Sequence, residues 1–137
     1  MTYSEWEAEV PEIIRHDSLW KLEAYRLGLF LSDLTWHDAG RLAQERRTLG
    51  IADQLFRATG NISSNIAEGY SRGTGRDRAR FYEYALGSTR ESRDWYFKSR
   101  HVLEPNVVEH RLELTTQIIR LTLTMVANER RKNQRFD

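Results

Sequence analysis

Four arginines near the middle of the chain have the type and spacing that could bind phosphate: Arg72, Arg76, Arg78 and Arg80. Asp77 is the only acidic residue among them. A guanidinium group presents a planar fork of donors that fits phosphate oxygens. A cluster of such groups neutralises phosphates without reading a base sequence. The cluster predicts a contact with RNA or DNA, and an ordinary charged turn is the alternative interpretation.

The sequence contains none of the patterns that mark common catalytic or cofactor sites. It has no cysteine, which excludes thiolate metal sites and a cysteine nucleophile. Its four histidines are scattered, without an H-E-x-x-H pattern or a pair at helical spacing. The glycines of "GYSRGTG" fit neither G-x-x-x-x-G-K-[ST] nor G-x-G-x-x-G. We therefore expect a non-enzymatic protein without a metal or a cofactor.

A polar stripe leads into the arginine cluster. Glu68 precedes Arg72 by four residues, which favours an ion pair within one helix. The stripe suits a contact between subunits, a partner site or a solvated helix face. Its residues are spaced by three or four positions and so project along one line of a helix: Gln54, Arg57, Asn61, Asn65, Glu68 and Arg72.

Small residues form a second line on the same helix, and they predict the close approach of a neighbouring helix. Gly87 and Ser88 offer a partner surface for that approach. We expect the helix to end near Gly73, where glycine adopts the left-handed conformation of a C-terminal cap. The members of the small-residue line are Gly60, Ser63 or Ser64, and Ala67.

Four amphipathic segments are expected to position these residues, because apolar side chains recur every three or four positions in each. The first begins at Trp20 and breaks around residues 37–40, and the second covers about residues 51–66. The third begins at a capping box formed by Thr74 and Asp77, and the fourth begins at Pro105. The pattern predicts an all-α protein, an antiparallel up-and-down four-helix bundle.

The spacing also predicts which faces are buried. The first segment buries Trp20, Ala24, Leu27, Leu31 and Leu34, and the second buries Ile51, Leu55, Ala58, Ile62 and Ile66. The third presents an inner face of aromatic and small residues: Phe81, Ala85, Ser88, Ser92 and Trp95. These faces carry broad flanks, which favour self-association because a second apolar flank needs another protomer to cover it.

The 137 residues fit one domain, residues 18–133, preceded by an acidic leader, residues 1–17. Five acidic residues against one arginine give the leader a formal charge of −4, which leaves +5 for the rest of a chain whose net charge is +1. Ser4 and Glu7 predict a short helix in the leader. The acidic start is unlike a secretory signal, and no apolar run reaches the roughly 18–20 residues of a membrane span. We expect a soluble, cytoplasmic protein.

A second basic group closes the sequence, where it complements the dipole of the last helix. We interpret it as a solvated tail. It comprises Arg130, Arg131, Lys132 and Arg135.

The segment "SNIAEGYSRG", preceded by "DQLFRA" and followed by "RFYEYALGSTRE", resembles the signature region of the 23S rRNA intervening-sequence proteins. That family is related to the accessory protein of diversity-generating retroelements. The resemblance covers about residues 18–130 and implies a four-helix bundle that assembles as a ring-like homopentamer. For the retroelement relatives it implies binding to RNA and to a reverse transcriptase through a basic surface. The matching positions that we assign to assembly are Gln54, Arg57, Asn65, Glu68, Gly69 and Gly87.

Two hypotheses follow. The first is a non-enzymatic homo-oligomer that binds nucleic acid, RNA in particular, or accompanies a reverse transcriptase. The second is an assembly or scaffold protein that binds another protein and has no nucleic-acid role. The near-neutral charge favours the second, and the arginine cluster favours the first.

Overall fold

The computed structural model describes residues 1–136, with side chains as far as Lys132, and all regular structure in that range is helical. The predicted all-α class is confirmed. None of the helices in this part of the chain combines the length and apolar character needed to cross a bilayer. The α-helices are α1 (Tyr3–Glu9), α2 (Glu12–Arg15), α3 (Glu23–Leu42), α4 (Leu49–Tyr70), α5 (Gly75–Lys98) and α6 (Pro105–Phe136). Short 3₁₀ helices occupy Ser18–Lys21, Arg46–Thr48 and Ser99–His101.

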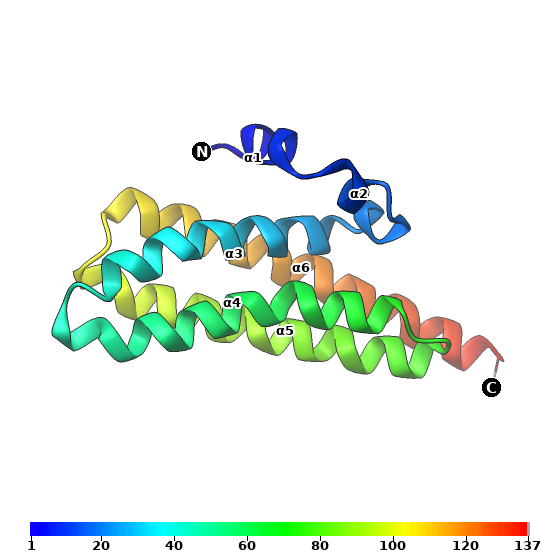
Figure 1. Ribbon diagram of the computed structural model, residues 1–137. Coiled ribbons are helices and arrows are strands. Elements are labelled where there is room, and N and C mark those ends of the chain that lie inside the picture. Colours follow the sequence, from blue (N-terminus) through cyan, green and yellow to red (C-terminus); the bar gives the residue numbers. More distant parts are fainter. Residues whose placement is uncertain (137) are drawn as a thin grey trace.

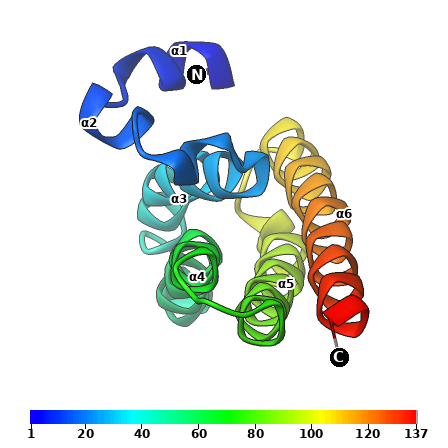
Figure 2. The same cartoon turned by 90° about the vertical axis from the view of Figure 1, so that its right-hand side faces the viewer.

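The four long helices, α3 to α6, lie side by side, and each runs opposite to the one before it (Figure 1). Seen along their length, they follow one another around a common centre in chain order (Figure 2). Consecutive helices pack extensively, whereas α3 and α6, which complete the circuit, touch far less. The interface between α3 and α6 is therefore the least extensive of the packing interfaces between neighbouring long helices.

The apolar faces predicted for α3 and α4 are confirmed almost throughout. Leu31, Leu55, Ile62 and Ile66 are fully buried, and the core also takes in Ala24, Leu27, Leu34 and Ala58. Trp20 and Ile51, at the ends of the two stripes, are only partly buried. The helical period of the apolar residues thus determined the inner surface of both helices.

The inner face of α5 agrees with the prediction at Ala85 and Ser92, which are fully buried, and differs from it by one position elsewhere. We expected Phe81, Ser88 and Trp95 to point inward, and the structure leaves them partly exposed. It buries the residues one position later: Tyr82, Thr89 and Tyr96. The hydroxyls of Thr89 and Tyr96 are satisfied inside, the first by the carbonyl oxygen of Ala85. A polar residue on the inner face therefore costs little, and hydrophobicity alone does not locate this face.

Two predicted helix ends are wrong. The first long helix does not break at residues 37–40 but continues to Leu42. The second ends at Tyr70 with Ser71 in a right-handed conformation, and within residues 1–136 no glycine has a positive φ. The end of α4 is closed by Ser71, whose N–H and hydroxyl both donate to the carbonyl oxygen of Ala67. The left-handed cap expected at Gly73 is thereby unnecessary.

Both predicted helix starts are confirmed. The hydroxyl of Thr74 accepts a hydrogen bond from the N–H of Asp77, 3.2 Å away, at the start of α5. Among the described residues the Asp77 carboxylate makes no reciprocal bond to the N–H of Thr74, so only half of the predicted capping box forms. Pro105 is the first residue of α6. These starts were predictable because a cap and a proline act on the backbone next to them.

The leader forms a helix as predicted and lies over α3 (Figures 1 and 2). Its cap is Thr2 rather than Ser4: the Thr2 hydroxyl accepts from the N–H of Glu5, and the Glu5 carboxylate accepts from the N–H of Thr2. Trp6 is buried against Trp20 and Phe30. The indole N–H of Trp6 donates to the carboxylate of Asp33 at 2.6 Å. The leader is therefore held against α3 of the same protomer.

Candidate nucleic-acid interface

The fold brings the two basic groups of the sequence together at one end of the long helices. The C-terminal part of α6 lies against the start of α5, where a side chain at Gly75 would meet the carbonyl oxygen of Glu129 at 2.8 Å. Arg130 forms an ion pair with Glu83 of α5. The group predicted as a solvated tail is instead the last part of α6, although the side chain of Arg135 lies outside the described residues. We call this region the basic end; it comprises Arg72, Arg76, Arg78, Arg80, Arg130, Arg131 and Lys132.

Arg78 differs from the other three predicted arginines because its guanidinium is already engaged. Its Nε donates to the Glu129 carboxylate at 3.0 Å, and its Nη1 donates to the carbonyl oxygen of Arg72 at 3.0 Å. The Arg78 side chain is 24% exposed and that of Glu129 is 11% exposed. Arg78 therefore joins α5 to α6 and to the α4–α5 turn, and it has little freedom to bind a ligand.

Arg72 and Arg80 flank the ring of Phe81. Their guanidinium carbons lie 4.8 and 5.3 Å from the ring centroid, within the range of a cation–π contact. The predicted ion pair between Glu68 and Arg72 is confirmed. Both arginines remain exposed, so the aromatic ring positions two cations at the surface.

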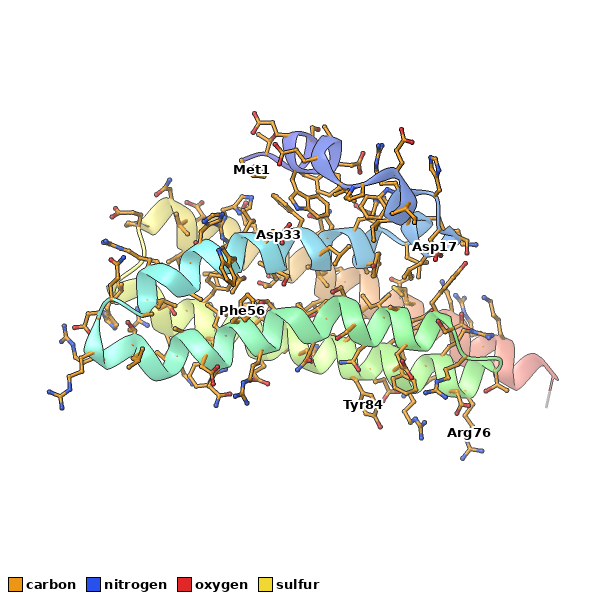
Figure 3. The ribbon with its side chains drawn as sticks, viewed as in Figure 1. Met1, Asp17, Asp33, Phe56, Arg76 and Tyr84 are labelled. Atoms are coloured by element: carbon orange, nitrogen blue, oxygen red, sulfur yellow. The ribbon has the colours of Figure 1, made fainter. Side chains whose placement is uncertain are left out.

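Arg76 and Tyr84 project outward from the same side of α5 (Figure 3). Within residues 1–132, no hydrogen bond or ion pair engages the side chain of Arg76. The ring of Tyr84 stands edge-on to Phe81, with centroids 5.5 Å apart, and is half-exposed. This arrangement presents cations and an aromatic ring to the same solvent region.

Gly69 explains how the basic end is held together. A Cβ atom at Gly69 would lie 2.8 Å from the Cβ of Phe81 and 2.9 Å from the ring of Tyr82. Only glycine therefore lets α5 approach α4 this closely. The close approach places the Phe81 ring beside Arg72. Gly69, a residue of the family motif, therefore acts through helix packing.

The remaining motif residues lie at the surface. Asn65 donates to the carbonyl oxygen of Asn61, and Arg57 pairs with Asp53 at 3.2 Å, both within α4. Gln54 and Gly87 are exposed, and a Cβ at Gly87 would meet nothing within 4 Å. Their assignment to assembly stays a prediction.

The predicted partner of the small-residue line is wrong. A Cβ at Gly28 of α3 would meet Ile62 at 3.0 Å and the backbone of Ser63 at 3.3 Å, so α3 makes the close approach, not Gly87 of α5. Gly60 has open space around it. The helical period fixed the direction of Ser63, but it did not indicate which helix lies opposite.

A buried polar network that was not predicted joins α3, α5 and α6. The Asp38 carboxylate accepts from the Tyr96 hydroxyl at 2.6 Å and from Arg111 Nε at 2.7 Å. The Tyr96 hydroxyl also lies 2.7 Å from the hydroxyl of Thr35. One signal was available: Asp38 follows Leu34 by four residues and so continues the apolar stripe of α3.

The surroundings raise the pKa values of two members of this network, Tyr96 and Arg111. Burial and the neighbouring Asp38 carboxylate raise the pKa of Tyr96 well above its usual value. Burial opposes the charge of Arg111, yet its hydrogen bonds to Asp38 and the Asp38 charge outweigh that effect and raise its pKa. Tyr96 therefore stays neutral, and the Arg111 guanidinium lies within ion-pair distance of the Asp38 carboxylate.

These features define an all-α protein of four long antiparallel helices with a basic end. The family model of the 23S rRNA-intervening sequence proteins matches residues 21–124, and the chain belongs to this family. The leader and the basic part of α6 lie outside the matched residues.

A solved structure has a similar fold. It is the crystal structure of a protein of unknown function from the S23 ribosomal protein family of Bacteroides thetaiotaomicron, with a TM-score of 0.70 and 17% sequence identity. The similarity covers 75% of this chain and 97% of that chain. A comparison with curated proteins finds no match.

Proposed function

We propose that this protein is a non-enzymatic, homo-oligomeric accessory that binds nucleic acid, RNA in particular, through its basic end. In this proposal the four long helices form an up-and-down bundle. The resemblance supports a pentamer and a reverse transcriptase as a further partner, and the acidic N-terminus, unlike a secretory signal, supports a cytoplasmic location. The family name, which refers to an intervening sequence of 23S rRNA, supports RNA over DNA.

The observation that carries the proposal is the meeting of two basic groups that lie far apart in the sequence. Seven cationic residues from the α4–α5 turn, α5 and α6 share the basic end with four carboxylates, those of Glu68, Asp77, Glu83 and Glu129. Three of these carboxylates already pair with arginines of the same cluster. The remaining positive charge favours the binding of phosphate groups. Binding of a nucleic acid to such a cluster is favoured further, because the polyanion releases its condensed counterions.

The non-enzymatic part of the proposal is supported by the buried titratable groups. Asp38, Tyr96 and Arg111 satisfy one another's hydrogen bonds within the core. All three donors to the Asp38 carboxylate belong to this network. The network therefore suits a structural role.

Salt-dependent binding to a structured RNA fragment tests the proposal. We expect the affinity to fall steeply with salt, and the double substitution Arg76→Glu, Arg80→Glu to reduce the slope of log K against log salt by about one to two units. Arg46→Glu is the matched control, because Arg46 is an exposed arginine at the opposite end of the long helices. Absence of binding at low salt, or equal losses in the control, would refute the RNA role.

A scaffold that binds another protein is the second candidate, and exposed apolar side chains favour it. Trp36 is 68% exposed and Phe97 is 50% exposed. An oligomer that binds no RNA at low salt yet retains a protein partner would support this candidate. Capture of a purified reverse transcriptase by the wild type, but not by the Arg76→Glu, Arg80→Glu variant, would support the retroelement-like role.

A further inference from the structure

An exposed aromatic pair projects from the outer side of α3 and α4. The rings of Trp36 and Phe56 stand edge-on to each other with centroids 5.8 Å apart. Trp36 is 68% exposed and Phe56 is 39% exposed; Phe56 lies near the start of α4 (Figure 3). Two large rings held against each other in solvent form an apolar projection, which we call the aromatic knob.

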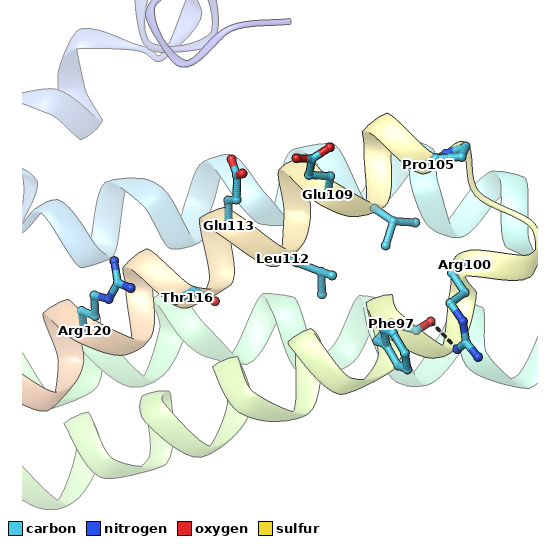
Figure 4. A pocket seen from close by; sticks show the side chains of 9 residues that line it. Phe97, Arg100, Pro105, Glu109, Leu112, Glu113, Thr116 and Arg120 are labelled. Atoms are coloured by element: carbon cyan, nitrogen blue, oxygen red, sulfur yellow. Dashed lines mark hydrogen bonds between the residues drawn. The ribbon is translucent and has the colours of Figure 1, made fainter.

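A groove of about 620 Å³ lies between the end of α5 and the start of α6 (Figure 4). Phe97, Val108 and Leu112 provide its apolar surface. Glu109 and Glu113 line it on α6, one helical turn apart. No hydrogen bond or ion pair with another described residue engages either carboxylate. The groove thus combines an apolar floor with hydrogen-bond acceptors that have no partner in the described chain.

The knob and the groove lie on opposite sides of the four long helices, because the α3–α4 and α5–α6 pairs face each other across the core (Figure 2). They also lie at the same end. Phe56 is seven residues after the first residue of α4, and Leu112 is seven residues after the first residue of α6. At 1.5 Å per residue, each is roughly 10 Å from its helix start. Since α4 and α6 run in the same direction, the knob and the groove both lie towards the end of the long helices at which α4 and α6 begin (Figure 1).

The chemistry of the two surfaces is complementary. The indole N–H of Trp36 makes no hydrogen bond to another described residue, whereas those of Trp6 and Trp95 each donate to a carboxylate. A buried tryptophan N–H requires an acceptor. Glu109 and Glu113 supply such acceptors beside an apolar floor.

We propose that the aromatic knob of one copy docks into the α5–α6 groove of a second copy, with the Trp36 indole N–H donating to the Glu109–Glu113 edge. The contact joins two different surfaces of the same chain, so an open row of copies keeps one free knob at one end and one free groove at the other until a ring closes. This inference rests on the proposed self-association and names the surfaces that produce it.

Cysteine cross-linking tests the geometry, because the chain has no native cysteine. Gly60 lies one turn beyond Phe56 and a Cβ there meets nothing within 4 Å, while Thr116 lines the groove one turn beyond Leu112. We expect a mixture of Gly60→Cys and Thr116→Cys chains to give at least tenfold more disulfide-linked dimer on mild oxidation than either variant alone. A mixture of Arg76→Cys and Thr116→Cys chains is the control, because Arg76 lies at the other end of the long helices.

Mass measurement separates this inference from the proposed self-association. By light scattering at micromolar concentration, we expect a wild-type mass several times 16.2 kDa, a shift towards 16.2 kDa for Trp36→Ala, and no shift for Tyr84→Ala. An oligomeric wild type without the selective cross-link, or an unchanged mass for Trp36→Ala, would overturn the docking surface alone. A wild-type mass of 16.2 kDa would overturn self-association as well.

Discussion

Asp38 and Arg111 form a buried ion pair between α3 and α6, with Arg111 Nε 2.7 Å from the Asp38 carboxylate. This pair bridges the two long helices that touch least among neighbours. Its side chains are 9% and 12% exposed, and Tyr96 adds a third partner from α5. A polar network thus joins α3 and α6, the neighbouring long helices with the least extensive packing.

Breaking this pair on one side is expected to be costly. Arg111→Met leaves the Asp38 charge buried without its partner and should lower the free energy of unfolding by about 3–5 kcal/mol, measured by urea titration. The double variant Asp38→Leu, Arg111→Met should recover much of that loss. Arg57→Ala, which breaks the exposed Asp53–Arg57 pair, is the control and should cost less than about 1 kcal/mol. Equal losses for Arg111→Met and Arg57→Ala would contradict the prediction.

Two glycines in the long helices should respond in opposite ways to alanine. Gly69→Ala forces a Cβ to within 2.9 Å of Phe81 and Tyr82 and should destabilise the protein by about 1–3 kcal/mol. Gly87→Ala meets nothing within 4 Å and should stabilise it by about 0.5–1 kcal/mol through helix propensity. Urea unfolding of both variants gives the comparison. A stabilised Gly69→Ala variant would show that α5 does not approach α4 closely at Gly69.

Stability should decline in alkaline solution. Burial raises the pKa of Tyr82 to about 12, and burial with the Asp38 charge raises the pKa of Tyr96 well above its usual value. The unfolded chain releases these protons near pH 10 while the folded chain retains them. The stabilising contribution is therefore complete below about pH 10 and is lost as the pH rises towards 12. Unfolding free energies measured across this range should fall, and less steeply in Tyr82→Phe than in Tyr84→Phe, which alters an exposed tyrosine.

The leader should detach when its tryptophan is removed. Trp6→Ala deletes the buried ring that contacts Trp20 and Phe30, together with the donor to Asp33. We expect proteolysis within residues 1–17 to accelerate at least tenfold, while the long helices stay resistant. Ile13→Ala is the control, because Ile13 is 84% exposed. Equal cleavage rates would show that other contacts hold the leader.

Local signals in the sequence predicted the start of each long helix after α3 to within two residues, because caps, prolines and apolar stripes act on neighbouring residues. The stripe of α3 and α4 was also predictable, since burial of one face repeats every three or four residues. The face of α5 was predictable only in part: Ala85 and Ser92 are buried as expected. Thr89 and Tyr96 are polar residues whose hydroxyls are hydrogen-bonded inside, and the partners of Tyr96 lie on α3.

The basic end also has features that could be predicted from the sequence and features that could not. The arginines at residues 72–80 and the Glu68–Arg72 pair could be predicted, since they depend on spacing within one segment. The inward engagement of Arg78 could not, because its partner Glu129 is 51 residues away.

By itself, the sequence determined an all-α chain, the helices that compose it and the arginines it carries, since each depends on interactions between residues a few positions apart. Only the tertiary structure decided that α6 delivers a second basic group to the α4–α5 turn, that Asp38 meets Arg111, and that the aromatic knob and the apolar groove face opposite ways. Those outcomes depend on which helices lie side by side, and a helical period indicates the direction of a side chain without identifying what it meets.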